Sequence, residues 1–291
     1  MHLSAQYAII EEKADGGEIM RKPFIAANWK MHKNIAESVD FVNQIKGKLP
    51  DPAKVEVGIA PQAFALYSMV QVAGNSGLKI IAQNAAAEYN GPFTGEISLR
   101  GLHDLGTNYA MLGHIERRHL FGENNAAVHK KVNAALQMGV TPIICTDETM
   151  VQKEVNGEIH YVFQQLMSVL HGVSLDQIRN VVISYEPSWA VGVGQHANVA
   201  LAEEGCRTIR RTIADNYTYE IADKIRILYG GSVNPDNIKD LMAKPDIDGV
   251  LIGRASLDVD NFLKMVNYLN DGKTNQQAGK WVVSRETELA C

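Results

Sequence analysis

Residues 226–254 read RILYGGSVNPDNIKDLMAKPDIDGVLIGR. Arg226–Tyr229 and Gly249–Ile252 are short, mostly apolar runs, and Pro235–Lys244 between them has helical spacing. A strand, a helix and a second strand in this order form a βαβ unit, in which the two strands are parallel. Parallel strands are buried on both faces, which explains why the runs are continuous and do not alternate with polar residues. The stretch therefore predicts one unit of a parallel α/β fold.

The same alternation of strands and helices continues along the rest of the chain. The predicted strands are Phe24–Trp29, Val55–Ala60, Lys79–Gln83, Tyr109–Gly113, Pro142–Cys145, Val181–Tyr185, Arg226–Tyr229 and Gly249–Ile252. The predicted helices are Ile35–Lys48, Asn124–Met138, Tyr161–His171, Val199–Asn216, Pro235–Lys244 and Val259–Leu269, whereas Gly91–Gly106 is predicted mostly as loop. Eight such units can close into a single (β/α)₈ barrel of about 250 residues. The alternative is an open doubly wound sheet, but no Gly-x-Gly-x-x-Gly motif follows the first strand.

The composition of the 291-residue chain is that of an ordinary globular protein, with 46% hydrophobic and 21% charged residues. No apolar run approaches the roughly 18 residues that a membrane span needs. The net charge of −5 disfavours nucleic acid as a partner, because proteins that bind it usually carry a basic excess. Three scattered cysteines and the lack of a signal-peptide pattern favour a reducing, cytoplasmic location.

We expect three parts along the chain: an N-terminal extension at 1–20, the barrel at 21–272 and a C-terminal tail at 273–291. The extension contains a charged, flexible stretch at 11–17 that is unlike a barrel strand. Either Met20 is the native start of translation, so that the extension is not made in the native host, or the extension is real and dispensable. The sequence leaves both alternatives open.

Residues with useful chemistry stand directly after five of the predicted strands. They are Lys30, His114, Glu186, Ser232 and the pair Gly253 and Arg254. In a parallel barrel the C-terminal ends of the strands meet on one face, where active sites of this fold are built. A carboxylate there can act as a general base. Position alone leaves Glu186 open to a capping or surface role, and His114 open to a structural one.

Six short motifs follow one another in order along the chain. They are ANWKM at 27–31, AQN at 82–84, FTGEIS at 93–98, LGHIERR at 112–118, YEPSWAVG at 185–192 and YGGSV at 229–233. Together they resemble the triosephosphate isomerase family, from about residue 22 to residue 270. The resemblance implies a TIM barrel that is an aldose–ketose isomerase of glycolysis and gluconeogenesis. Such an enzyme interconverts dihydroxyacetone phosphate and D-glyceraldehyde 3-phosphate through an enediolate, without cofactor or metal ion.

The resemblance also implies roles for individual residues. Glu186 would be the base that abstracts a proton beside the substrate carbonyl, and His114 would be a neutral hydrogen-bond donor at the start of a helix. Asn28 and Lys30 would contact the substrate, and Glu116 would hold Lys30 in place.

Phosphate binding, closure and assembly follow from the resemblance in the same way. Backbone N–H groups of Gly192, Ser232 and Gly253 would bind the phosphate. The segment Pro187–Ala197 would be a lid that excludes water from the intermediate. The long loop Asn84–Ser98 would insert into a second copy of the chain, so we expect a homodimer.

Four residues depart from the family pattern. Ile115 replaces a serine that holds the resting base, Asp147 replaces a glycine, and Gln195 replaces a lysine in the lid. Arg254 replaces the second glycine of the last phosphate-binding turn, which would cost of order 1 kcal/mol or more if its φ were positive. The Arg254 guanidinium could also contact the substrate.

These departures keep two alternatives open. One is an isomerase of a four-carbon ketose phosphate, L-erythrulose 1-phosphate or D-erythrulose 4-phosphate, which Ile115 and Arg254 favour. The other is a barrel that binds a sugar phosphate without turnover. The joint presence of His114 and Glu186 with Asn28 and Lys30 speaks against the second alternative, because binding alone needs no base.

Overall fold

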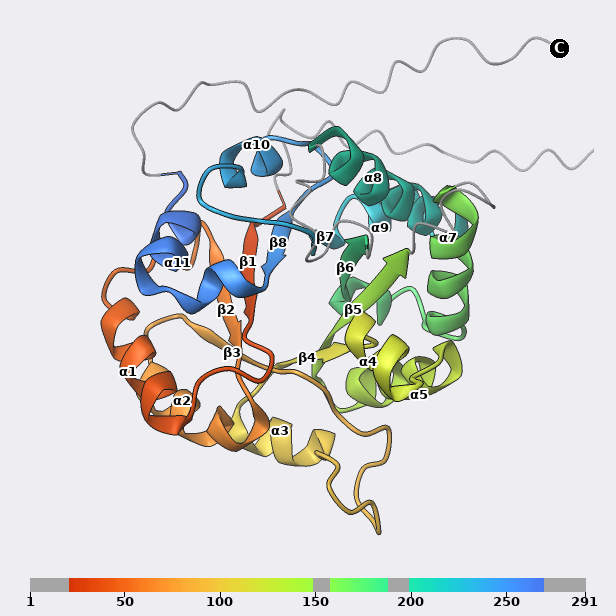
Figure 1. The fold of residues 1–291 in the computed structure, drawn as a ribbon. Helices are drawn as coiled ribbons and strands as arrows, with labels where there is room; N and C mark the ends of the chain where they lie inside the picture. Colours follow the sequence, from red (N-terminus) through yellow and green to blue (C-terminus); the bar gives the residue numbers. More distant parts are fainter. Residues whose placement is uncertain (1–20, 149–157, 188–198, 270–291) are drawn as a thin grey trace, which may run out of the picture.

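Eight parallel strands close into a barrel in the computed structural model, which describes residues 21–148, 158–187 and 199–269 (Figure 1). The strands are β1 (Phe24–Asn28), β2 (Glu56–Ala60), β3 (Lys79–Ala82), β4 (Tyr109–Leu112), β5 (Thr141–Glu148), β6 (Val182–Pro187), β7 (Arg226–Tyr229) and β8 (Gly249–Ile252). Each strand pairs with the next along the chain, and β8 pairs with β1. The predicted (β/α)₈ barrel is confirmed. The expected extension at 1–20 and tail at 273–291 lie outside the described residues.

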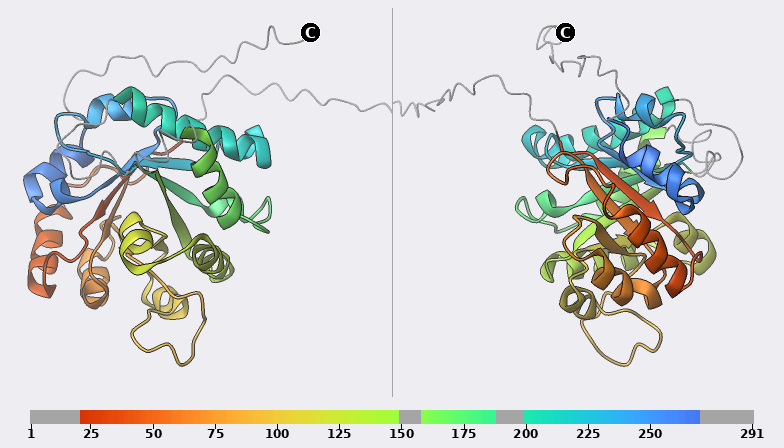
Figure 2. Two further views of the ribbon diagram at one scale, coloured as in Figure 1. Left: turned by 45° about the vertical axis from the view of Figure 1, so that its right-hand side comes forward. Right: turned by 90° about the vertical axis from the view of Figure 1, so that its left-hand side faces the viewer.

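Helices surround the barrel on its outside (Figures 1 and 2). They are α1 (Ile35–Ile45), α2 (Leu66–Ala73), α3 (Leu99–Leu105), α4 (Ile115–Phe121), α5 (Asn125–Gln137), α7 (Glu158–Val169), α8 (Val199–Asn216), α9 (Tyr219–Ala222), α10 (Ile238–Met242) and α11 (Val259–Val266), with the 3₁₀ turns η1 (Ala63–Ala65), η2 (Ile178–Asn180) and η4 (Arg254–Leu257). In the described ranges, no helix combines the length and the apolarity needed to cross a membrane.

Several predicted helix boundaries differ from the structure, α2 and α9 are not among the predicted helices, and two of the differences have a clear local cause. The stretch Gly91–Gly106, predicted mostly as loop, holds α3 in its second half, because the Ser98 side chain accepts a hydrogen bond from the N–H of Gly101 and caps the helix. Helix α10 is shorter than predicted. The side chain of Asn234 accepts hydrogen bonds from the N–H groups of Asp236 and Asn237 and holds these residues in a turn before the helix begins.

Strands β5 and β6 run further than the apolar runs that predict them. They stay paired through polar residues, with Asp147 opposite Glu186 and Glu148 opposite Pro187. Glu186 therefore lies on β6 itself and not beyond the end of a strand. Pairing with β5 at this position places the side chain more rigidly than a loop would.

Alternation along the strands divides their side chains between the barrel interior and the helix layer. One buried cluster draws its members from the strands alone: Phe24, Ala26, Ala60, Ile81, Met111, Ile143, Cys145, Val182, Leu228 and Leu251. Ile25, Ala27 and Trp29 on and after β1 belong instead to the larger cluster shared with the helices. The barrel interior is thus a packed core, and Asn28 continues its side of β1 at the C-terminal end.

A polar cluster fills the opposite, N-terminal end of the barrel. Glu56 accepts hydrogen bonds from Tyr109 Oη at 2.8 Å and from Arg226 Nη1 at 2.5 Å. Burial alone would raise the pKa of Glu56, but the charge and hydrogen bonds of Arg226, with the Tyr109 hydroxyl, lower it. The guanidinium of Arg226 also lies 5.0 Å from the ring centroid of Phe24. These contacts close this end with satisfied polar groups.

Replacing Gly249 by alanine should destabilise the barrel. A Cβ at this position would lie 2.0 Å from the Phe24 carbonyl oxygen on β1, so the β1–β8 pairing would have to shift. We expect the free energy of unfolding to fall by about 2 kcal/mol, as for overpacked cores. Urea denaturation measures this. Gly47→Ala is the control, because a Cβ there meets no atom within 4 Å; equal midpoints for the two variants would contradict the expectation.

Candidate active site

The C-terminal end of β1 holds Lys30 in a constrained backbone conformation. Lys30 has a φ of 51°, a left-handed value that is uncommon for a residue with a side chain. Its N–H donates to the Asn28 side chain at 3.0 Å, and the Gln83 amide donates to its carbonyl oxygen at 2.8 Å. The Lys30 ammonium lies 2.5 Å from a carboxylate oxygen of Glu116, at the start of α4. The structure thus brings Lys30, Asn28 and Glu116 together.

His114 precedes α4 as its N-cap and is 8% exposed. Its Nδ1 accepts a hydrogen bond from the N–H of Glu116 at 3.2 Å. An Nδ1 that accepts carries no proton, so the proton of the neutral ring is on Nε2. Nε2 is 3.7 Å from Oε2 of Glu186 and faces the site as the donor.

Glu186 is a buried carboxylate, 1% exposed, whose two oxygens have different partners. Oε2 accepts the backbone N–H of Ile115 at 3.2 Å, and Oε1 accepts the hydroxyl of Ser184 at 3.4 Å. Burial raises the pKa of the Cys145 thiol well above its usual range, and the nearby Glu186 carboxylate raises it further. The base candidate is therefore held by neutral groups and largely removed from water.

Ser232 lies three residues beyond the end of β7, and Gly253 and Arg254 directly follow β8. Arg254 begins η4, and among the described non-glycine residues only Lys30 and Lys33 have a positive φ. The backbone strain expected for an arginine at position 254 is therefore absent. Gly192, Gln195 and the rest of the expected lid beyond Pro187 lie outside the described residues.

A cavity of about 380 Å³ lies between the segment at the end of β1 and the segment that follows β8. It is lined by Asn28, Lys30, His32, Arg254 and Leu257. The basic side chains of Lys30 and Arg254 and a histidine in one cavity favour an anionic ligand. His32 and Gln83 are site residues that sequence reasoning missed; AQN at 82–84 marked Gln83 only as part of a motif, without a role.

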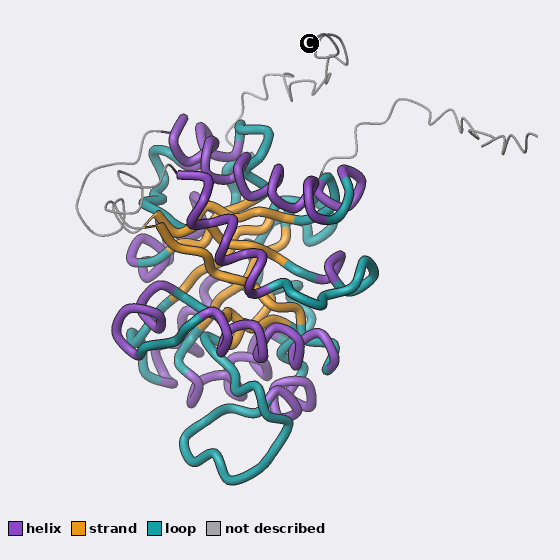
Figure 3. The backbone as a smooth tube through the Cα atoms, turned by 90° about the vertical axis from the view of Figure 1, so that its right-hand side faces the viewer, coloured by secondary structure: helices purple, strands orange, loops and turns teal. Residues whose placement is uncertain are grey.

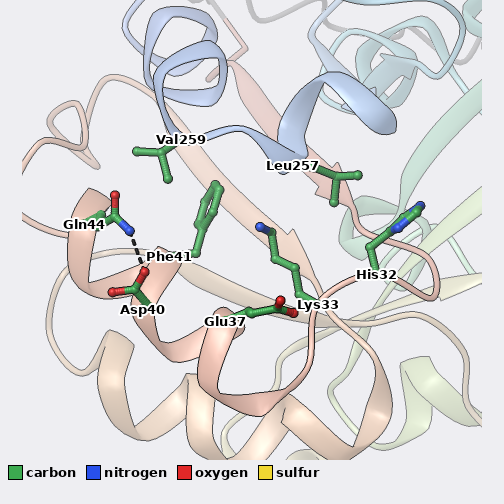
Figure 4. A pocket seen from close by; sticks show the side chains of 8 residues that line it. All are labelled: His32, Lys33, Glu37, Asp40, Phe41, Gln44, Leu257 and Val259. Carbon is green, nitrogen blue, oxygen red and sulfur yellow. Dashed lines mark hydrogen bonds between the residues drawn. The ribbon is translucent and has the colours of Figure 1, made fainter.

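A second cavity, of about 360 Å³, lies beside the segment that joins β1 to α1, against α1 and α11 (Figure 4). Glu37 and Asp40 line it together with Lys33, whose ammonium is 4.8 Å from the ring centroid of Phe41. Carboxylates beside the single lysine make this cavity a poor anion site. The cavity with Lys30 and Arg254 is the better candidate.

Asp147 forms a compact cluster next to the base. Its carboxylate lies 2.6 Å from Nε2 of His119 on α4 and accepts the amide of Gln165 on α7 at 2.6 Å. The side chain of Asp147 is 2% exposed, whereas that of His119 is 43% exposed. The carboxylate therefore links α4 and α7 to β5 by hydrogen bonds, at the residue of β5 that is paired with Glu186.

The comparisons with known proteins agree on one family. The family model described as triosephosphate isomerase matches residues 23–269. Triosephosphate isomerase from Lactobacillus gasseri is 49% identical over 249 residues, covering 86% of this chain and 99% of its own. The protein of that name from Lactiplantibacillus plantarum is 48% identical over 252 residues, covering 87% and 100%. That from Lactobacillus acidophilus is 46% identical over 248 residues, covering 85% and 98%.

Removing the Asp147 carboxylate should destabilise the fold. Asp147→Ala removes the carboxylate contacts to the buried Gln165 amide and to the His119 ring and leaves that amide only its 3.3 Å contact with the backbone carbonyl of residue 147, which costs about 2 kcal/mol of unfolding free energy. Asp147→Asn, which keeps an acceptor oxygen, should lose less. Urea denaturation provides the measurement, with the exposed Asp215→Ala on α8 as the control. If Asp147→Ala and Asp215→Ala unfold at the same midpoint, the cluster contributes nothing.

Proposed function

The chain belongs to the triosephosphate isomerase family, and on that premise we propose that it interconverts dihydroxyacetone phosphate and D-glyceraldehyde 3-phosphate. One observation carries the proposal: a buried carboxylate, a histidine donor and a lysine meet at the mouth of one barrel. The named relatives favour the three-carbon substrate, and neither comparison supports the four-carbon alternative. A barrel that only bound the sugar phosphate would have no use for a desolvated base.

Proton transfer begins at Glu186. Its carboxylate takes a proton from C1 of dihydroxyacetone phosphate, and the electron pair moves into a C1–C2 double bond, so that the carbonyl oxygen becomes an enediolate oxygen. The Nε2–H of His114 and the ammonium of Lys30 stabilise the charge on that oxygen. Glu186 then returns the proton to C2, while the O1 hydroxyl proton passes to O2 by way of His114. The aldehyde forms with no net gain or loss of atoms.

The phosphate end is assigned to the loops after β6, β7 and β8. Backbone N–H groups of Ser232 and Gly253 bind the dianion, with Gly192 as a third donor. Asn28 orients the substrate, and the Arg254 guanidinium adds a charged contact from the rim of the cavity that Lys30 also lines. Backbone donors let a protein with a net charge of −5 bind an anion.

We place the enzyme in the cytoplasm, as a homodimer, with nucleic acid and membranes excluded as partners. The cysteines in the described part of the chain, Cys145 and Cys206, are free and buried, which fits a reducing compartment. The steps above need neither cofactor nor metal ion.

A loop that stands out from the barrel supports the dimer (Figures 2 and 3). It lies between β3 and α3, and its base is closed by the N–H of Ala86, which donates to the carbonyl of Ile97 at 2.8 Å. Tyr89 and Phe93 on this loop are 50% and 43% exposed, and Met31, beside Lys30, is 87% exposed. Large apolar side chains on a long loop are typical of an interface that a second copy covers.

Substituting Glu186 by aspartate should lower kcat far more than it changes KM. The shorter side chain withdraws the carboxylate by about one methylene, and a 1 Å misplacement costs on the order of 100-fold in rate. Steady-state kinetics with three-carbon and four-carbon sugar phosphates side by side give the measurement. Glu204→Asp, an exposed position on α8, is the matched control. A raised KM with unchanged kcat would assign Glu186 to binding instead of proton transfer.

Light scattering at micromolar concentration should give twice the mass of the chain. The pair Tyr89→Asp and Phe93→Asp should shift the protein towards the monomer, because two charges would be buried in the interface. Tyr219→Asp, at a tyrosine that is 76% exposed on α9, should leave the mass unchanged. An active, stable monomer of the unaltered chain would refute the dimer.

A further inference from the structure

Ser184 is a second polar side chain on the same side of β6 as the base. It lies two residues before Glu186, so alternation along the strand sends both side chains towards the barrel interior. The Ser184 hydroxyl is 3.4 Å from Oε1 of Glu186, and both residues are almost completely buried. We propose that Ser184 is a positioning residue, whose hydroxyl fixes the carboxylate plane of Glu186 for proton transfer.

The two carboxylate oxygens need separate donors if the plane is to be fixed. The terminal torsion of a glutamate is broad and has no strong preference of its own. The N–H of Ile115 holds Oε2 only, and the His114 ring faces the same oxygen. Ser184 supplies the donor to Oε1, so rotation of the carboxylate would break one hydrogen bond or the other.

The described neighbours offer Oε1 no equal substitute. The side chain of Ile115 is apolar and contributes to the site through its backbone N–H. Cys145 is a buried thiol with a raised pKa, which remains protonated and is a weak donor. Ser184 is fully buried, so bulk water does not take over its role.

Close packing confines the hydroxyl to this position. A Cβ on Gly230 of the β7 end would lie 2.7 Å from Cγ of Glu186 and 2.9 Å from Oγ of Ser184. The two side chains therefore rest against the same stretch of backbone, where any side chain at position 230 would collide with them. The serine is small enough for this space and still carries a donor.

The inference rests on the proposed isomerase function, and the two are tested separately. Isomerase activity of the unaltered protein tests the function, and a comparison of variants tests Ser184. Ser184→Ala should lower kcat about tenfold with KM within about twofold, the pattern of an interaction used in the transition state. Ser184→Cys, which keeps a weak donor of similar size, should lose less and serves as a second variant if alanine impairs folding. Ser38→Ala is the control, because Ser38 is an equally buried serine on α1.

A conservative variant separates positioning from a structural role. Ser184→Cys keeps a donor at the same place on β6, so its kcat should lie between those of Ser184→Ala and the unaltered chain, with KM unchanged. A kcat for Ser184→Cys no higher than that for Ser184→Ala would overturn the proposal. So would wild-type kcat and KM in Ser184→Ala, or a kcat loss equal to that of Ser38→Ala.

Discussion

Pairing of β8 with β1 is the contact on which the rest of the structure depends. Phe24 lies opposite Gly249 and Ala27 opposite Ile252, and this register turns a row of strands into a ring. Only a residue without a side chain fits at the start of β8, since any Cβ would meet the Phe24 carbonyl. Closure also brings the first and last parts of the barrel sequence together. Lys30 and Arg254, far apart in sequence, line one cavity because of it.

Charge is distributed unevenly around that mouth. The cations gather beside β1 and β8, whereas the base on β6 is surrounded by neutral donors from Ile115 and Ser184. A carboxylate with a cation at hydrogen-bond distance would be a weaker base, because the pair stabilises its ionised form. The Lys30 ammonium is instead matched by Glu116, which keeps it directed at the mouth. Because Lys30 and Glu186 have different partners, one site can bind an anion and also contain a base.

The sequence predicts the strands well because parallel strands need continuous apolar runs, as in Phe24–Ala27. It underestimates β5 and β6, since Asp147 and Glu186 end the apolar pattern although their backbone stays paired. Helix α3 is missed because a short helix that starts at a serine cap has little periodicity of its own. In the site, residues at strand ends are predicted by position and by motif. The support from Gln83 and Ser184 is not, because hydrogen bonds to a carbonyl or to a neighbour on the same strand leave no pattern in the sequence.

The polar cluster of Glu56, Tyr109 and Arg226 affects how substrate and product enter and leave. Together with the packed interior it closes the N-terminal end of the barrel, so the barrel is not a channel. Substrate and product must then enter and leave through the C-terminal end, one molecule at a time. Since each is the substrate of one direction of the reaction, each also obstructs entry of the other. Accumulated product therefore slows the forward reaction by competing for the single open end of the barrel.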